Sequence, residues 1–155
     1  MAFKLSERSL KKLEGVHPDL VEVVSEAIKI TAVDFGVTYG VRTLHEQAEL
    51  KRTGRSQTMK SKHLIQDTGY AHAVDLVAYF GSDISWELNV YDDICDAMAE
   101  AARKNSVALK WGAAWSEGDI RTYPSTAEDA MNAYVDLRRS QGRRPFIDAP
   151  HFEMM

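Results

Sequence analysis

Apolar residues recur every three or four positions in four long segments of the chain, which is the period of a helix with one buried face. These segments are residues 17–30, 44–54, 86–107 and 125–144. Pro18 suits a first helical turn, while Thr43 can cap the second helix and Gly54 can end it. Ser6 can cap a further, short helix. The pattern therefore predicts four long helices and one short one.

Shorter segments rich in β-branched and aromatic residues predict strands. They are residues 34–42, 71–80, 108–112 and 151–155, of which the second is expected to be the central strand. In the first, Val37, Tyr39 and Val41 alternate with small or polar residues. Because helices and strands are mixed without regular β-α-β alternation, we expect an α+β fold, with a small antiparallel sheet and helices packed on it. A length of 155 residues, without a repeat or a linker, predicts one domain over 1–155.

The composition narrows the class of protein. Apolar residues make up 45% of the chain and charged residues 27%, as in soluble globular proteins, and a net charge of -4 argues against a general nucleic-acid binder. No segment is apolar enough to span a membrane, and the N-terminus lacks the apolar run of a secretory signal, so we expect a protein made in the cytoplasm. We also expect it to be a monomer. The single cysteine, Cys95, excludes an internal disulfide and is expected to be a buried structural thiol.

Residues 61–79 hold two histidines and an aspartate, and a further histidine lies near the end of the chain. A catalytic zinc ion takes three protein ligands and keeps one position for water, and His63, Asp75 and His151 would fill that pattern. His72 competes with His63. However, it lies three residues before Asp75, and an odd separation in a regular strand puts two side chains on opposite faces. From spacing alone, a solvated loop histidine and an edge-strand histidine remain the simpler interpretation.

Four motifs in a fixed order change that interpretation: YGVRT, SKH…AHAVDLVAY, KWGAAW and DAPHFE. With them, residues 34–153 resemble the zinc peptidases of the D-Ala-D-Ala carboxypeptidase and LAS type, most closely the phage endolysins that act as L-alanyl-D-glutamate endopeptidases. The resemblance implies the single-domain fold of the LAS (hedgehog/D-Ala-D-Ala peptidase) type. The twelve residues from the first histidine to the aspartate exceed the usual family spacing, which a longer loop allows at small entropic cost.

The resemblance also implies roles for individual residues. His63, Asp75 and His151 would bind Zn²⁺, and Asp148, three residues before His151, would be the general base. Arg42 would hold a substrate carboxylate or stabilise the oxyanion. Without the family, a turn acid would be the better interpretation of Asp148, and a surface salt bridge an equal one for Arg42.

Residues around these positions are expected to support them. Ser61 would hydrogen-bond the substrate or orient its loop, and Glu153 shares a strand face with the last histidine, where a carboxylate can support a metal ligand. Trp111 and Trp115 are expected to form core and cleft wall. The remaining histidines are expected to be structural or solvated: His17, His45 and His72.

The function implied is zinc-dependent hydrolysis of the peptide stem of bacterial peptidoglycan by a phage endolysin. Such a protein is made in the host cytoplasm and reaches the periplasm through a holin pore. A D-Ala-D-Ala carboxypeptidase is the alternative within the same class. A zinc-binding module without catalysis, and a phage structural protein with a fortuitous motif, are alternatives from other classes.

Overall fold

The central strand of the sheet is β2 (Ala73–Phe80), the segment with the strongest strand pattern in the sequence. The computed structural model, which describes residues 2–56 and 58–155, pairs it on one side with β1 (Asp34–Tyr39). On the other side it pairs first with β5 (His151–Met154) and, further along, with the short β3 (Asp83–Ser85). The last strand, β4 (Leu109–Trp111), pairs with β5, and every pairing is antiparallel. The predicted α+β class and antiparallel sheet are confirmed.

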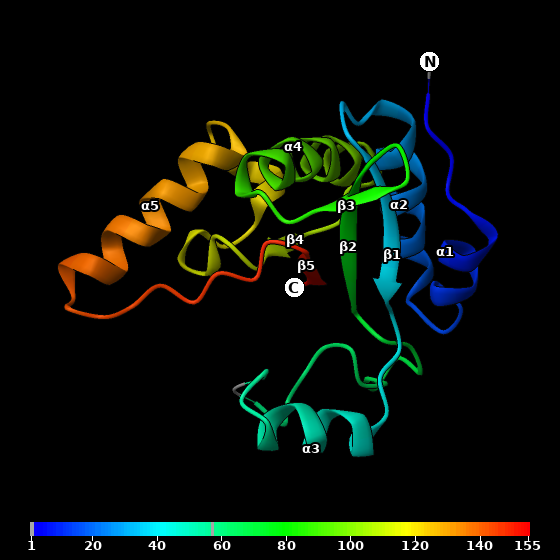
Figure 1. Cartoon of the computed structure of the whole chain (residues 1–155), viewed down its shortest axis with the longest axis horizontal. Coiled ribbons are helices and arrows are strands. Elements are labelled where there is room, and N and C mark those ends of the chain that lie inside the picture. Colours follow the sequence, from blue (N-terminus) through cyan, green and yellow to red (C-terminus); the bar gives the residue numbers. More distant parts are fainter. Residues whose placement is uncertain (1, 57) are drawn as a thin grey trace.

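Helices cover one face of this sheet (Figure 1). The helices of the described residues are α1 (Glu7–Lys12), α2 (Pro18–Ile30), α3 (Leu44–Arg52), α4 (Leu88–Asn105) and α5 (Ala127–Ser140), with short 3-10 turns at Trp115–Glu117 and Ile120–Thr122. The apolar faces of α2 and α4 pack on each other and on the sheet, and α5 packs on α4. Cys95 lies fully buried in this layer, as expected.

Alternation along β2 separates the core from the opposite face. Val74, Leu76 and Ala78 belong to the buried apolar core. Asp75 therefore points to the other face, and the register pairs it with His151 of β5. The sheet thus presents an aspartate and a histidine side by side on the face that α2 and α4 leave uncovered.

A bulge interrupts the alternation predicted for the first strand. The register of β1 against β2 shifts between Val37 and Tyr39, so Val37 is buried in the core while the ring of Tyr39 is half exposed on the face of Asp75. A bulge of this kind re-aims a side chain at the end of a strand. The strand ends at Tyr39, three residues before the predicted limit.

Several other boundaries also differ from the prediction. The last helix ends at Ser140 instead of 144, because Gly142 takes a positive φ of 68° that a helix cannot continue through. Strand β3 was not predicted, since its three residues carry too little pattern to distinguish them from a loop.

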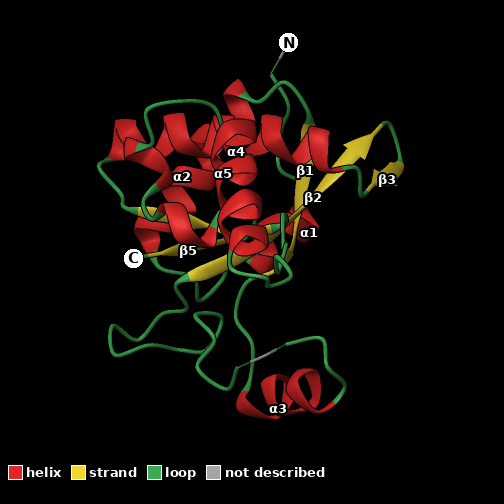
Figure 2. Ribbon diagram, turned by 90° about the vertical axis from the view of Figure 1, so that its left-hand side faces the viewer, coloured by secondary structure: helices red, strands yellow, loops and turns green. Residues whose placement is uncertain are grey.

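Helix α3 lies apart from the rest of the molecule (Figures 1 and 2). Thr43 and Glu46 form a reciprocal capping box at its start. The single buried residue of α3 is a polar one, Gln47. Within the described residues, the helix packs extensively on no other helix or strand. We call α3 and the segment after it (residues 44–56 and 58–60) the α3 arm.

None of the helices in residues 2–56 and 58–155 has the length and apolar character needed to cross a membrane.

One buried carboxylate lies in the helical layer. Asp92 of α4 is 8% exposed, and its Oδ1 has no hydrogen-bond partner among the described residues. Burial, together with the charges of Glu128, Asp96 and Asp93, raises the pKa of Asp92 to about 6. An acid whose pKa rises on folding destabilises the folded state as it ionises. The penalty is absent below the unfolded value near 3.8 and complete above about 6.

We therefore expect Asp92→Asn to stabilise the protein at pH 7.5 by about 1–2 kcal/mol, with the gain vanishing toward pH 4. Urea unfolding at the two pH values measures the difference. Glu100→Gln, an exposed acid on the same helix, should change the free energy of unfolding little. An equal gain for Asp92→Asn at both pH values would contradict the argument.

Candidate metal centre and active-site cleft

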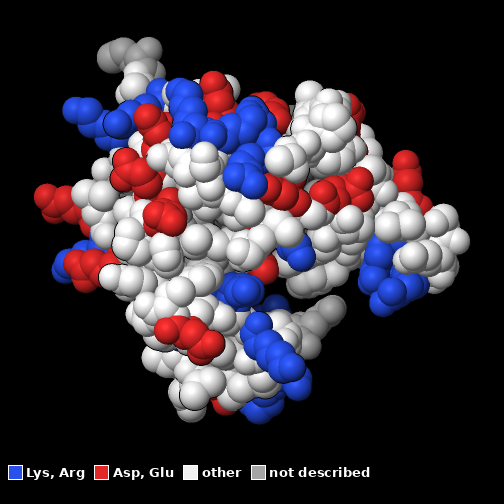
Figure 3. All heavy atoms as spheres, turned by 180° about the vertical axis from the view of Figure 1, so that it is seen from behind, with Lys and Arg blue, Asp and Glu red and all other residues white. Residues whose placement is uncertain are grey.

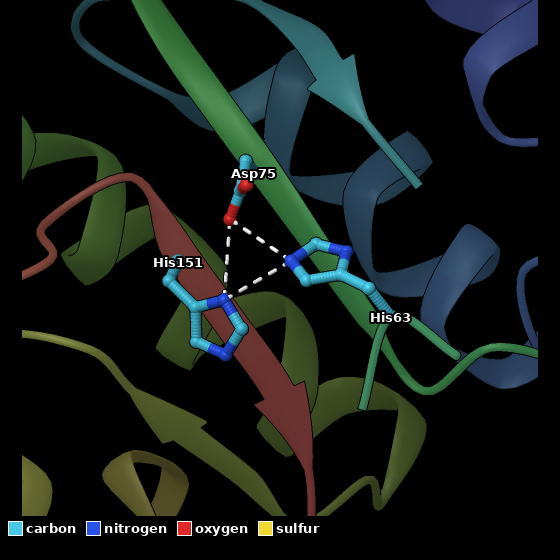
Figure 4. A group of neighbouring side chains, drawn as sticks. All are labelled: His63, Asp75 and His151. Atoms are coloured by element: carbon cyan, nitrogen blue, oxygen red, sulfur yellow. Dashed lines mark hydrogen bonds and ion pairs between the residues drawn. The ribbon is translucent and has the colours of Figure 1, made fainter. Parts of the chain in front are cut away.

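Three side chains from distant parts of the chain converge on one point (Figure 4). His63 Nε2 lies 3.2 Å from Asp75 Oδ1 and 3.2 Å from His151 Nδ1, and the last two atoms are 3.1 Å apart. Asp75 and His151 come from paired strands, and His63 comes from the loop before β2. These three residues could hold a metal ion, and we call them the metal group.

Hydrogen bonds on the outer side fix which ring nitrogens face inward. His63 Nδ1 lies 2.8 Å from the carbonyl oxygen of Gly40, and His151 Nε2 lies 2.9 Å from Glu153 Oε1. Both partners only accept, so these nitrogens carry the ring protons and leave lone pairs on the inward nitrogens. With neutral imidazoles, the three inward atoms are all acceptors and repel one another unless a cation lies between them.

The spacing and donor set fit zinc. Two imidazole nitrogens and a carboxylate oxygen are ligands of catalytic zinc sites, and bond lengths of about 2.0–2.1 Å imply edges of about 3.3–3.4 Å in a tetrahedral site. The measured separations of 3.1–3.2 Å are close to this value. Glu153, which was expected to lie on the same strand face as His151, places its Oε1 2.9 Å from the outer nitrogen of that histidine.

Charge is concentrated at this point. Burial would lower the pKa of His151, but its hydrogen bonds to Asp75 and Glu153 raise it to about 10. Burial would also raise the pKa of Asp75, yet hydrogen bonds from His151 and His63 hold it well below its usual range. The site therefore favours a positive charge among its three inward atoms. A proton supplies that charge without a metal, so a metal ion must compete with a proton at His151.

The segment before His151 is held by its backbone. Asp148 N donates to the carbonyl oxygen of Gly112 at 2.8 Å, and Gly112 N donates to that of His151 at 2.8 Å. A Cβ at residue 112 would clash with the Asp148 carbonyl oxygen, so only glycine permits this approach. Trp111, fully buried, donates from Nε1 to the carbonyl oxygen of Ala149 at 2.8 Å. The KWG motif thus places the aspartate next to the metal group.

Asp148 lies partly buried in the wall of the same cleft. Burial and then the charge of Asp75 raise its pKa, while His151, His63 and Arg42 pull it down. The net rise makes Asp148 a better proton acceptor than an exposed aspartate. Its position and chemistry suit proton transfer beside the metal group.

Arg42 reaches the group from the other side. Its Nη2 lies 3.7 Å from Asp75 Oδ2, and its Nη1 donates to Gln47 Oε1 at 2.8 Å. The guanidinium also lies 5.7 Å from the centre of the Tyr39 ring, which the bulge in β1 turns to this face. Ser61 Oγ accepts from the backbone N of His63 at 3.1 Å, so this serine orients the loop that carries the histidine.

Tyr39, Arg42, Ser61 and Asp148 line one cleft of about 930 Å³ together with the metal group. The α3 arm forms one wall with His45 and Glu49, and Trp115 and Phe146 form the other. The rings of Trp115 and His151 lie 5.5 Å apart. Basic residues of the arm side also line the cleft, among them Arg55, Lys60 and Lys62. Figure 3 shows basic side chains over the lower part of the molecule, where the arm lies.

The comparison with protein families decides the identity of the chain. The family described as phage L-alanyl-D-glutamate peptidase matches residues 1–155, the whole chain. The chain belongs to this family. The predicted peptidase class is therefore confirmed.

Two individual proteins similar to this family member are consistent with the family assignment. The L-alanyl-D-glutamate peptidase of Escherichia phage T5 is 30% identical over 120 residues, which cover 75% of this chain and 84% of that protein. The crystal structure of the Serratia marcescens L-Ala D-Glu endopeptidase ChiX superposes with a TM-score of 0.72 at 32% identity. That match covers 99% of this chain and 91% of ChiX, so the similarity extends over the fold as a whole.

The other histidines of this family member stay outside the metal group. His72 precedes β2, where its Nε2 lies 2.7 Å from Thr68 Oγ1 and its ring contacts that of His17 edge-on, with centroids 5.2 Å apart. His17 caps α2, and its Nδ1 accepts from Asp19 N at 3.1 Å. His45 is exposed at the cleft wall.

Sequence reasoning missed one residue of the site, Gln47. It is fully buried and contacts Arg42, but it lies on a helix whose other residues are exposed or nearly so. No spacing in the sequence distinguishes it from a surface glutamine. Gly40 and Gly112 lie in the YGVRT and KWGAAW motifs, yet the contacts that require them depend on the fold.

Proposed function

We propose that this protein is a zinc endopeptidase that hydrolyses the L-alanyl–D-glutamate bond in the peptide stem of bacterial peptidoglycan. The observation that carries the proposal is the convergence of His63 Nε2, Asp75 Oδ1 and His151 Nδ1 within a cleft that also contains a partly buried Asp148. In this proposal the first three residues are the metal ligands and the fourth is the general base.

Bound zinc supplies Lewis acidity and makes water a nucleophile near neutral pH. Asp148 accepts a proton from the attacking water and passes it to the leaving amine. Arg42 forms a planar, doubly donating contact with a substrate carboxylate or with the oxyanion that develops on the scissile carbonyl. Ser61 holds the loop of His63 in place, and Glu153 accepts a hydrogen bond from the outer ring N–H of His151.

The basic residues of the cleft support a substrate rich in carboxylates. Glutamate follows the scissile bond in an L-alanyl–D-glutamate substrate, so a carboxylate lies close to the reacting carbonyl. Arg42, Arg55 and Lys60 can attract it at the arm side of the cleft. We propose that residues 1–155 form one peptidase domain and that the protein is a monomer. It would act on the cell wall of a host during phage release.

Mass analysis of the products released from purified peptidoglycan tests this function. An endopeptidase of this kind frees stem peptides with a new N-terminal glutamate and leaves alanine on the glycan. Release of free C-terminal alanine instead would assign a D-Ala-D-Ala carboxypeptidase. Stoichiometric zinc without any product would assign a binding module.

Arg42→Lys separates the proposed role of Arg42 from a structural salt bridge. Lysine keeps the charge but loses the planar fork, so we expect normal folding and zinc content with kcat/KM reduced about 30- to 1000-fold, the equivalent of roughly 2–4 kcal/mol. A change mainly in KM would indicate binding of a carboxylate, and an equal fall in kcat would indicate oxyanion stabilisation. Arg52→Lys, at an exposed position of α3, is the matched control. Unchanged kinetics with a lowered melting temperature would reduce Arg42 to a structural role.

A further inference from the structure

A glutamine anchors the α3 arm where an apolar residue would be expected. Gln47 is fully buried, whereas Leu44 of the same helix is 68% exposed and Met59, later in the arm, is 38% exposed. Burying an amide is unfavourable unless its polar atoms are hydrogen-bonded. The hydrogen bonds of Gln47 therefore explain why it occupies this position.

Those hydrogen bonds run in two directions. Gln47 Oε1 accepts from Arg42 Nη1 at 2.8 Å, on the side of the metal group. Gln47 Nε2 donates to Ser56 Oγ at 2.8 Å and to the carbonyl oxygen of Thr58, both in the arm. The reversed amide would set its donors against those of the guanidinium, so the chemistry permits only this orientation.

The contacts form one continuous chain. It runs from Ser56 and Thr58 through Gln47 to Arg42, whose second nitrogen lies 3.7 Å from Asp75 Oδ2. No residue of the arm belongs to the apolar core within the described residues, so this chain of hydrogen bonds is one link between the cleft wall and the metal group. A shift of the arm therefore moves Gln47, and Gln47 moves the guanidinium.

We propose that Gln47 is a positioning residue that couples the α3 arm to Arg42, so that a peptide gripped by the arm fixes the guanidinium beside the metal group. The coupling rests on the proposed function, because it assigns its effect to the role of Arg42 in hydrolysis. Gln47 itself does not line the cleft, and its side chain contacts Arg42, Ser56 and Thr58. Its effect on turnover passes through the guanidinium that it orients.

Kinetics of Gln47→Met test the coupling. Methionine matches the length of glutamine without its hydrogen bonds, so we expect kcat to fall about tenfold to a hundredfold through misplacement of Arg42, with zinc content unchanged. Gln47→Glu still accepts from Arg42 but cannot donate to Ser56 or Thr58, so it should recover kcat only in part. Ala48→Met, an exposed position on the same helix with the same new side chain, should behave as wild type. Ser56→Ala is a milder variant that should reduce kcat less, in case Gln47→Met folds poorly.

The double variant Gln47→Met/Arg42→Lys distinguishes positioning from general stability. If Gln47 acts through Arg42, the double variant should be no slower than Arg42→Lys alone. Losses that multiply, or wild-type kcat in Gln47→Met, would overturn the proposal.

A second measurement is independent of catalysis. Hydrogen exchange of the amides in residues 44–56 should accelerate in both Gln47→Met and Arg42→Lys, because the coupling acts in both directions. An inactive wild type with zinc bound would refute the proposed function alone. Unchanged exchange in Arg42→Lys would refute the coupling, whatever the activity.

Discussion

Alanine at His63, Asp75 or His151 should abolish both zinc binding and hydrolysis. Each substitution removes one of the three proposed ligand atoms, which lie within 3.2 Å of one another, and two atoms alone should hold the ion too weakly to retain it. We expect zinc content near zero by elemental analysis after exchange against a weak chelator, and no detectable release of peptide from peptidoglycan.

His72→Ala is the matched control, because it removes a histidine nine residues from His63 that contacts Thr68 and His17 instead of the metal group. It should retain zinc and most of the activity. A His72→Ala protein without zinc, alongside a zinc-loaded His63→Ala protein, would reverse the assignment of the first ligand. Far-ultraviolet circular dichroism should show folded protein in each case, since the core lies on the other face of the sheet.

Asp148→Asn should separate chemistry from metal binding. Asparagine fills the same space and keeps the backbone bonds to Gly112 and His151, but it cannot accept a proton. We expect zinc content and melting temperature close to wild type and turnover reduced about a hundredfold or more, the usual scale for loss of a general base.

The pH profile gives a second observable for Asp148. Because burial and the charge of Asp75 raise its pKa, the acidic limb of kcat/KM should lie above the range of an ordinary aspartate, with activity lost as pH falls through it. Asp148→Asn should lose that limb. Asp136→Asn, at an exposed position on α5, should keep both rate and profile. Near-full activity of Asp148→Asn at neutral pH would place the base elsewhere.

The sequence predicted the elements whose residues repeat with a clear period. Helix α2 and strand β2 each bury many side chains in the same core. The spacing of these side chains along the sequence is therefore recognisable without the structure. The bulge after Val37 and the three-residue β3 depend on pairing with β2, which no local pattern records. The end of α5 depended on the conformation of one glycine.

Some residues of the candidate site could likewise be predicted from the sequence, and others could not. His63, Asp75 and His151 could be named because zinc ligands come from a few residue types, and the motifs fixed their order. The oxygen that fixes the ring of His63 is the backbone carbonyl of Gly40, which any residue possesses. Gln47 owes its place to partners from separate segments. Contacts of these kinds become visible only with the folded chain.

The isolation of the α3 arm also bears on how this scaffold can be altered. Its exposed positions contribute almost nothing to the packed interior, so replacing them should leave the folded state and the metal centre intact. The same positions form one wall of the cleft. A library of variants confined to the residues of α3 that line the cleft, with Gln47 kept, would test whether the arm sets the preference for cell-wall peptides. The arm thus offers positions at which the cleft can be altered and which the packed core does not constrain.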